Sequence, residues 1–507
     1  MNSENSRIAK NTIYLYLRTI VVLLISLYTS RVVLQSLGID DFGIYNVVGG
    51  LVAMFSFING AMAAATLRFL TYELGKNNNQ RLKIVFCTSI IIHLVISFIV
   101  IVLGETVGLW FLYNKMIIPP DRMFAATIVY QISILTAVIS IMNVPYNSLL
   151  IAHERMSSFA YISILDATLR LLTAISISIY IYDRLILYSI LIFGAYAIVI
   201  FIYWIYCRRS FPESHFQFIK DQALITKMSK FASWNLFSNL AFVTYTQGLN
   251  ILLNVFYGPA VNAARGIAVQ VQQAVVRFVD SFQSALNPQI TKSYACNDRE
   301  RLLFLIDTSS RYSFYLLLML IFPLIASIDY ILSIWLGVVP DHTSNFVRLT
   351  LLIEPISVMM NPLNIATQAT GHIKRFFFIT GTLQLIILPL AYIALIMGGP
   401  PEAVYIVYFA HVFLSSFVYM YVTCAEIQLS MSFFFKTVVI KLYLILLIAA
   451  IIPLLFDIYL PQTNSLWIAL IKMLVAELSV LFSVILLGTK QTERITIISI
   501  LKKKLSI

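Results

Sequence analysis

Charged residues are scarce in this sequence. Asp, Glu, Lys and Arg make up 11% of its 507 residues, against about 25% in an average soluble domain. Hydrophobic residues make up 60%, and the mean hydropathy is +0.87. Long apolar runs follow one another with only short polar connections, which excludes a sizeable soluble domain. We therefore predict an all-α polytopic membrane protein.

Cysteine and histidine are also few. The four cysteines (Cys87, Cys207, Cys296 and Cys424) form no C-x-x-C pair, and the six histidines do not cluster. No D-x-D, H-E-x-x-H, G-x-S-x-G or P-loop pattern stands at a membrane boundary. These absences argue against a disulfide framework, a zinc site and a catalytic centre. We predict no bound metal, no cofactor and no enzymatic activity.

Hydrophobic runs of sufficient length predict about 14 spanning helices. The first six lie near 12–36, 43–70, 84–112, 122–150, 158–182 and 185–207. The next six lie near 231–257, 259–290, 304–336, 346–370, 376–398 and 402–428. Two more lie near 438–458 and 465–488.

The basic residues set the orientation. With the N-terminus inside, the inner loops and tail hold roughly 23 Lys and Arg and the outer loops roughly 4, as the positive-inside rule requires. Both termini are then cytoplasmic, and the net charge of +12 reflects this bias. We expect an N-terminal six-helix lobe at 1–207, a connection at 208–230, a second six-helix lobe at 231–428, two additional helices at 429–488, and a basic tail at 489–507.

The two predicted lobes resemble each other in sequence. A shift of 220 residues places Gly38 on Gly258, Asn77 on Asn297 and Arg81 on Arg301. Later, MNVPYNSLLIAHER resembles MNPLNIATQATGHIK with a gap of two residues. The shift spans six helices, an even number, so both copies have the same orientation in the membrane. Transporters built from such parallel repeats place a substrate site near the midplane between the halves and work by alternating access.

One predicted span is unusually polar: GPAVNAARGIAVQVQQAVVRFVDSFQSALNP, residues 258–288. At about 100° per residue, its polar side chains fall on one arc about 160° wide. The arc comprises Asn262, Arg265, Gln272, Gln273, Arg277, Asp280, Gln283, Ser284 and Asn287. Because lipid rejects such a face, we expect it to meet water in a cavity or polar partners.

Arginine dominates the charged residues within spans, and its planar donors match phosphate. A cavity walled with arginine, asparagine and glutamine suits an anionic, hydroxyl-rich substrate such as a phosphorylated sugar. The candidate substrate-binding residues are Arg18, Arg31, Asn59, Arg68, Asn250, Arg265, Gln273 and Arg277. The alternative for Arg18, Arg31 and Arg68 is snorkelling to headgroups. Neutralisation by a nearby carboxylate is the alternative for Arg277, beside Asp280, and for Arg170, beside Asp166.

Two acidic residues are candidates for ion coupling. Asp280 lies deep in the polar span, and Glu354 opens EPISVMMNP in a later span. Desolvation favours proton uptake by a carboxylate, whereas a nearby arginine opposes it. A proton or sodium gradient is therefore a candidate energy source.

Several stretches resemble a known family. They are LGIDDFGIYNVV after the long first span, ATLRFLTYELGK with Arg68, and NVPYNSLLIAHER at the end of the fourth span, within two six-span halves and two extra helices. Over essentially the whole chain, the sequence resembles the bacterial O-antigen-type oligosaccharide flippases. These form the polysaccharide transporter branch of the multidrug/oligosaccharidyl-lipid/polysaccharide (MOP) exporter superfamily.

This resemblance implies two six-helix lobes around a central cavity in the bacterial inner membrane. It also implies the substrate: an oligosaccharide repeat unit on undecaprenyl pyrophosphate, moved from the cytoplasmic to the periplasmic leaflet for O-antigen or capsule synthesis. Partners would be membrane lipids and other polysaccharide-assembly membrane proteins, with no nucleic acid.

Two other functions are alternatives. A multidrug or organic-cation antiporter of the same superfamily would favour acidic and aromatic residues in its cavity, whereas arginine dominates here. A membrane-embedded polysaccharide polymerase or glycosyltransferase would carry a large outer loop or a catalytic signature, and every predicted outer loop is short.

Overall fold

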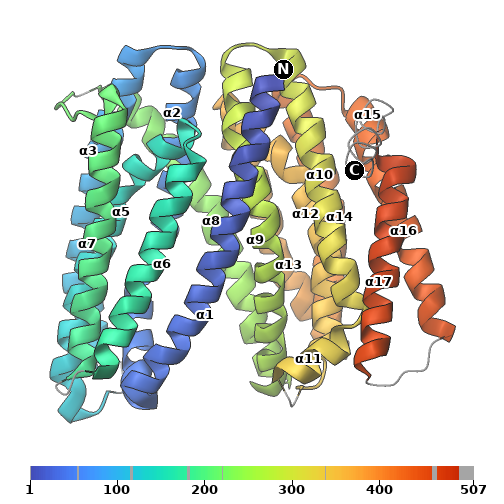
Figure 1. Cartoon of the computed structure of the whole chain (residues 1–507), viewed down its shortest axis with the longest axis horizontal. Helices are drawn as coiled ribbons and strands as arrows, with labels where there is room; N and C mark the ends of the chain where they lie inside the picture. The colour runs from blue at the N-terminus through green and yellow to red at the C-terminus, as the bar shows by residue number, and fades with distance from the viewer. Residues whose placement is uncertain are drawn as a thin grey trace, which may run out of the picture. The chain divides into compact units, whose positions relative to one another are not determined.

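The computed structural model describes residues 2–53, 56–114, 118–179, 183–219, 221–257, 259–336, 339–459 and 465–489. Within these ranges the chain is almost entirely helical and contains no strand (Figure 1). The predicted all-α fold is therefore confirmed.

The chain forms two compact units. Unit 1 comprises Met1–Asn239 and Ser284–Asp298, and unit 2 comprises Leu240–Gln283 and Arg299–Ile507. The boundaries fall inside α8 (Gln222–Tyr257) and α9 (Pro259–Ala295). Each of these two helices therefore belongs to both units.

Unit 1 is organised around α5, which packs against α1, α2, α3 and α7. Its helices run side by side in Figure 1. Its elements before α8 are α1 (Asn2–Ala53), α2 (Ser56–Gly75), α3 (Asn79–Leu103), η1 (Gly104–Gly108), α4 (Leu109–Asn114), η2 (Pro120–Arg122), α5 (Met123–Ala152), α6 (Met156–Ile179), α7 (Arg184–Ser210) and η3 (Pro212–Ser214).

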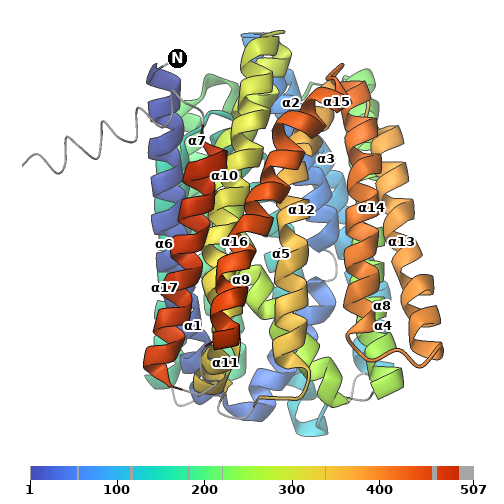
Figure 2. The ribbon, with the colours of Figure 1, turned by 90° about the vertical axis from the view of Figure 1, so that its right-hand side faces the viewer.

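Unit 2 repeats this packing. Its α12 packs against α10 and α14, as α5 packs against α3 and α7, and α13 packs on α14 as α6 packs on α7 (Figure 2). Its elements after α9 are α10 (Arg299–Ala326), α11 (Ile328–Leu336), α12 (Thr343–Thr370), α13 (Lys374–Ile396), α14 (Ala403–Glu426), α15 (Met431–Phe434), η4 (Phe435–Val439), α16 (Ile440–Tyr459), α17 (Leu466–Ser483) and η5 (Val484–Gly488). The last two long helices, α16 and α17, pack on each other, and α17 packs on α10.

Eleven helical stretches among the described residues are long and apolar enough to cross a membrane. The other three predicted spans, 43–70, 231–257 and 259–290, fall on α2 with the end of α1, on α8 and on α9. Of these three, α8 and α9 are more polar than the other spans, and residues 54 and 55 of the first lie outside the described residues. The predicted span at 304–336 was wrong as a single helix: it is divided at Ser327, which donates its hydroxyl to the Ala469 carbonyl of α17 at 2.9 Å.

Gly38 explains how the first two predicted spans join. Within α1, Gly38 has φ 80° and ψ 172°, so the helix is interrupted there. A residue with a Cβ is strained at a left-handed φ, whereas glycine is not. The predicted spans 12–36 and 43–70 therefore lie on either side of this kink. Gly258, its partner in the repeat, lies outside the described residues.

The repeat is visible in backbone geometry. Asn77 and Asn297 both have a left-handed φ, 53° and 56°. At Asn77, the amide bonds to the carbonyl three residues back at 3.1 Å, and the next amide bonds five residues back at 3.2 Å. The same two bonds follow Asn297, at 3.1 and 3.0 Å. Asparagine tolerates this helix-ending conformation better than most residues, which explains why both copies use it.

A pair of side chains is repeated at the start of the fourth span of each copy. In unit 1, Arg122 donates to Asp183 at 2.8 Å and also to Asp41 at 2.5 Å. In unit 2, His342 contacts Glu402 at 2.7 Å. Burial alone would raise the pKa of Glu402, but hydrogen bonds from His342 and Asn345 outweigh it and lower that pKa. The pKa of Asp183 is likewise lowered, by Arg122 and the Ile186 amide against the effect of burial.

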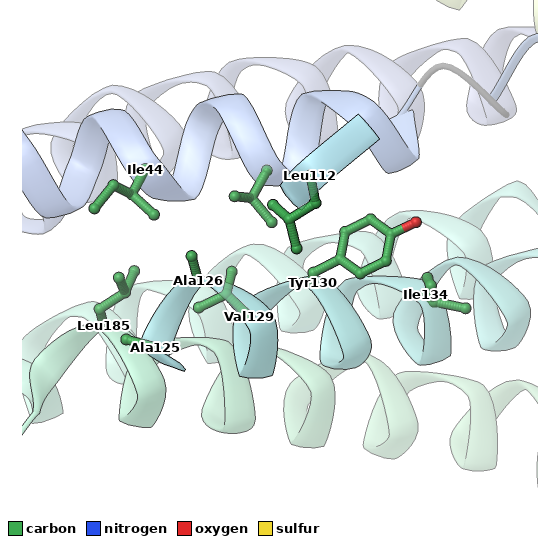
Figure 3. Packing of buried hydrophobic residues seen from close by; sticks show 9 residues of the cluster. Ile44, Leu112, Ala125, Ala126, Val129, Tyr130, Ile134 and Leu185 are labelled. Carbon is green, nitrogen blue, oxygen red and sulfur yellow. The ribbon is translucent and has the colours of Figure 1, made fainter. Parts of the chain in front are cut away.

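Figure 3 shows one apolar cluster of unit 1, formed by α1, α4, α5 and α7. Ile44, Leu112, Val129 and Leu185 are all buried in it. Tyr130 also belongs to the cluster, and its hydroxyl donates to the Gly104 carbonyl at 2.7 Å. Gly104 begins the π turn η1, and a π turn changes the helical bonding pattern locally. The tyrosine hydroxyl is thereby buried with a partner, which avoids its desolvation cost.

Candidate substrate-binding and ion-coupling site

The middle of α9 has a polar exposed face. Gln270, Gln273, Arg277, Asp280 and Ser284 are all exposed and recur every three or four residues along the helix. This spacing places them on one stripe. Charged side chains in a spanning helix face water or polar partners, not acyl chains. We call these five residues the α9 stripe; they include three of the predicted site residues.

The prediction that all polar residues of α9 share one environment was therefore wrong. Gln283 is buried and Gln272 is half-buried, although the helical wheel placed both with Arg277. The side chain of Asn262 lies outside the described residues. The arc divides into an exposed stripe and a flank that bonds to neighbouring helices.

Arg265 is held by α8 within unit 2. Its guanidinium is buried, donates from Nε to Asn250 Oδ1 at 2.5 Å and from Nη2 to the Thr246 carbonyl at 3.2 Å. It also lies over the Tyr405 ring, 5.8 Å from the centroid. Two predicted binding residues, Arg265 and Asn250, are thus in direct contact. Because neither partner is a carboxylate, these contacts leave the positive charge of Arg265 unneutralised.

Glu354 is buried in α12 of unit 2. Gln272 of α9 donates its amide to the Glu354 carboxyl at 2.5 Å. Asp280, the other predicted coupling residue, is exposed on the α9 stripe. The two predicted carboxylates therefore differ: Glu354 is enclosed and held by an amide, and Asp280 is open to exchange.

Gln283 satisfies a carbonyl of α12. Pro362 has no N–H, so the carbonyl of Val358, four residues earlier, loses its helical partner. Gln283 donates to that carbonyl at 3.0 Å and accepts from Asn361 at 2.5 Å. In a membrane such a freed carbonyl needs a polar partner, and a side chain of the polar helix α9 supplies it here.

The structure places the predicted unit 1 arginines in aromatic surroundings. Arg68 is buried, with its guanidinium 4.5, 4.9 and 5.8 Å from the ring centroids of Phe69, Tyr72 and Phe231. Arg18 is half-buried in α1, 4.8 Å from the Phe159 ring centroid. Such cation–π contacts stabilise a partly desolvated arginine. Arg31 and Asn59 lie on α1 and α2, and their side chains lie outside the described part of the chain.

Of the two predicted pairings between an arginine and a nearby carboxylate, the structure contains one. Arg170 does bond to Asp166, at 2.8 and 3.0 Å. Arg277 and Asp280 form no ion pair with each other or with any other described residue. Arg277 is therefore an exposed arginine that has no ion pair within the part of the chain that the structure describes.

Sequence reasoning missed one polar centre. Glu154, in the turn between α5 and α6, is buried and gathers donors from distant segments of unit 1. It appeared in the sequence only as part of the HER end of a repeated motif. A charged residue at a helix end gives no local signal that the fold will bury it.

The family of the chain follows from its sequence match. The polysaccharide biosynthesis protein family matches residues 8–294, more than half of the length. The chain belongs to this family. Membership confirms the resemblance to the polysaccharide transporter branch of the MOP superfamily. No curated protein matches the chain.

Solved structures share the fold of this polysaccharide biosynthesis family member. A MATE crystal structure in a straight conformation is 14% identical, with a TM-score of 0.68, and the match covers 84% of this chain and 96% of that one. An outward-facing multidrug resistance MATE transporter of the MOP superfamily is 14% identical, with a TM-score of 0.66 and the same coverage. A MOP superfamily transporter from Pyrococcus furiosus, described by the reverse polarity of its binding pocket, is 14% identical, with a TM-score of 0.62 and coverage of 83% and 96%.

Proposed function

We propose that this protein is a flippase that moves undecaprenyl-pyrophosphate-linked oligosaccharide repeat units from the cytoplasmic to the periplasmic leaflet of the bacterial inner membrane. Both termini are cytoplasmic in this proposal, and the cycle is alternating access. The observation that carries it is the α9 stripe: a spanning helix exposes glutamine, serine, aspartate and an arginine without an ion pair among the described residues, where an outer helix would expose leucine. Membership in a polysaccharide biosynthesis family supports a glycan substrate.

The chemistry of the stripe suits this substrate. Arg277 offers a fork of donors to pyrophosphate oxygens. Gln270, Gln273 and Ser284 offer donors and acceptors to sugar hydroxyls. Arg265, held by Asn250 and Thr246, adds a fixed positive charge to unit 2. The polyprenyl tail stays in lipid, because no stripe residue is a large apolar one.

Glu354 and Asp280 are the proposed ion-coupling residues. Glu354 is enclosed beside Gln272, and Asp280 is exposed on the stripe that meets the substrate. A proton or sodium ion taken up by these carboxylates removes negative charge near Arg277 and Arg265, which favours binding of an anionic substrate. Release of the ion then weakens that binding.

The first test is translocation of a short-glycan undecaprenyl-pyrophosphate lipid by purified protein in proteoliposomes. Wild type is compared with Arg277→Ala, and with Arg209→Ala as the matched control. Arg209 is also an exposed arginine, at the end of α7. The proposal requires transport by wild type and the control and reduced transport by Arg277→Ala. Equal transport by all three proteins would remove the α9 stripe from the mechanism.

A multidrug antiporter is the second candidate, because the structures that share this fold include multidrug resistance transporters. Its expected cargo is an organic cation, which an arginine on the exposed stripe would repel. Exchange of an organic cation for protons in the same vesicles, without lipid translocation, would establish the antiporter in place of the flippase.

A further inference from the structure

One buried carboxylate of unit 1 joins three segments that are far apart in sequence. Glu154 forms an ion pair with Arg7 Nε of α1 at 3.1 Å and accepts a hydrogen bond from Lys292 Nζ of α9 at 2.5 Å. Gln289 of α9 donates its side-chain amide to the same carboxylate. The Glu154 side chain is 1% exposed, whereas the Arg7 side chain is 50% exposed. We call these four residues the Glu154 cluster.

The backbone of Glu154 is strained to make these contacts. Its φ is 58°, in the left-handed region that glycine normally occupies. In the second copy the corresponding end of α12 uses a glycine, Gly371, with φ 80°. A charged residue kept in such a conformation points to a role that glycine cannot fill.

The same end of α9 also packs closely against α2. A Cβ added at Gly75 would lie 2.8 Å from the Ala295 Cβ and 3.0 Å from Lys292 Cα. Cys296 donates its thiol to the Gly75 carbonyl at 2.7 Å. The end of α9 is thus held in unit 1 by its close approach to the backbone of α2 and by the Glu154 cluster. Both contacts require this one position of α9 relative to α2 and to the α5–α6 turn.

We propose that the Glu154 cluster is a reversible latch that holds the 284–295 end of α9 on α1 and on the α5–α6 turn. A permanent contact would need no charge, since replacing a buried ion pair by packed apolar residues is often neutral or stabilising. A charge cluster with one partner half exposed to water, by contrast, can exchange protein contacts for water when it opens. α9 begins in unit 2, so a change there reaches the latch along a continuous helix.

The role of this latch in transport rests on the proposed function. The experiment that tests whether the latch opens measures cysteine labelling and does not depend on transport. Ser293, on the latched segment, is buried, and Cys296 is the exposed one of the four free cysteines. In a Cys296→Ser background, Ser293→Cys becomes a reporter whose maleimide labelling requires the end of α9 to move away. Cys87, Cys207 and Cys424 are buried, and they stay unlabelled in a folded protein.

Glu154→Gln should raise the labelling rate at position 293 roughly tenfold or more, while the three buried cysteines stay protected. Lys292→Gln should raise it less, because Arg7 still faces the carboxylate. The double exchange Glu154→Lys with Lys292→Glu should restore slow labelling. The matched control is Asp221→Asn, which removes the more exposed Arg81–Asp221 bridge of unit 1 and should leave labelling unchanged.

Labelling of Glu154→Gln within about twofold of its parent would overturn the latch and leave a static brace. If Glu154→Gln also exposes the buried cysteines, the double exchange decides: restored protection supports the latch, and continued exposure overturns it. Faster labelling in a protein that translocates no lipid-linked glycan would keep the latch and remove the proposed function.

Discussion

Helix α17 of unit 2 and helix α9, which belongs to both units, expose opposite kinds of surface. Along α17 the exposed side chains include Trp467, Leu470, Leu474, Leu478 and Phe482. Along α9, at the same helical spacing, the exposed residues are the glutamines, arginine, aspartate and serine of the α9 stripe. Both helices are long enough to span a membrane, so the difference identifies the solvent each one meets.

The contrast teaches that exposure has two meanings in a membrane protein. An exposed leucine on α17 lies against acyl chains at no cost, since lipid tails are as apolar as the side chain. An exposed arginine on α9 would be costly there and is tolerated only in water or against a polar ligand. Residue type and exposure together, and neither alone, separate a face that suits lipid from a face that suits water.

The largest expected effect is a charge placed on the lipid face. Leu474→Arg on α17 should cost about 2.5–3.5 kcal/mol of insertion free energy, the value for arginine at the centre of a spanning helix. Gln273→Arg on the α9 stripe should cost little, because that face already meets water. The yield of monodisperse protein extracted from membranes measures both. Similar losses in the two variants would mean that α9 also faces lipid.

The next effect is on transport. Arg277→Leu should leave the yield and thermal stability unchanged, because Arg277 has no ion-pair partner among the described residues. It should lower translocation of the lipid-linked glycan roughly tenfold, through loss of charge-assisted bonds to pyrophosphate. Arg277→Lys should retain part of the rate. A loss of stability equal to that of Leu474→Arg would contradict a water-facing stripe.

Arg265 gives a smaller effect on stability. Arg265→Ala leaves Asn250 and the Thr246 carbonyl without their donor, and should cost about 1–3 kcal/mol, the desolvation penalty of a buried unpaired group. Asn250→Ala should cost less, since Arg265 keeps Thr246. The apparent melting temperatures in detergent test this order, and the reverse order would mean that Arg265 has its main partner elsewhere.

The smallest expected effect is on the pH dependence of stability, and it compares equivalent carboxylates, Asp183 and Glu402, in the two repeat copies. Hydrogen bonds lower the pKa of Glu402 below its ordinary 4.5, so its contribution to stability is present above that value and is lost as the pH falls through the lowered pKa. Glu402→Gln should therefore destabilise by up to about 1 kcal/mol near pH 7, with the difference closing below pH 4.5. For Asp183→Asn the difference should persist to lower pH, because the ordinary pKa of Asp183 is 3.8. Melting temperatures against pH measure both, and a difference that grows on acidification would contradict the assignment.

The sequence predicted the helices and the repeat well, because both depend on local patterns. The long apolar runs form helices in the structure. Asn77 and Asn297, which the shift of 220 residues aligns, form turns with the same backbone conformation. The polar character of α9 was also evident from its own residues.

The division of that polarity was not predictable. Gln272 and Gln273 are neighbours in the sequence, yet one bonds to Glu354 and the other is exposed. Arg68 and Arg277 looked alike in the sequence, as arginines within predicted spans. The structure places Arg68 against Phe231, which is distant along the chain. Neighbours set by tertiary packing decide these cases, and helical periodicity holds no information about them.

Gly75 and Ala295, which the repeat places in equivalent positions, touch each other at the ends of α2 and α9. In a symmetric dimer a residue on the twofold axis meets its own copy, so any change there appears on both sides at once. A chain that carries both copies is free of that restriction: it has a glycine on one side and an alanine on the other, beside a lysine that bonds to Glu154. Carrying both halves in one polypeptide thus allows the two helix ends at this contact to differ. The end of α2 presents a glycine without a side chain, and the end of α9 carries a lysine that bonds to Glu154.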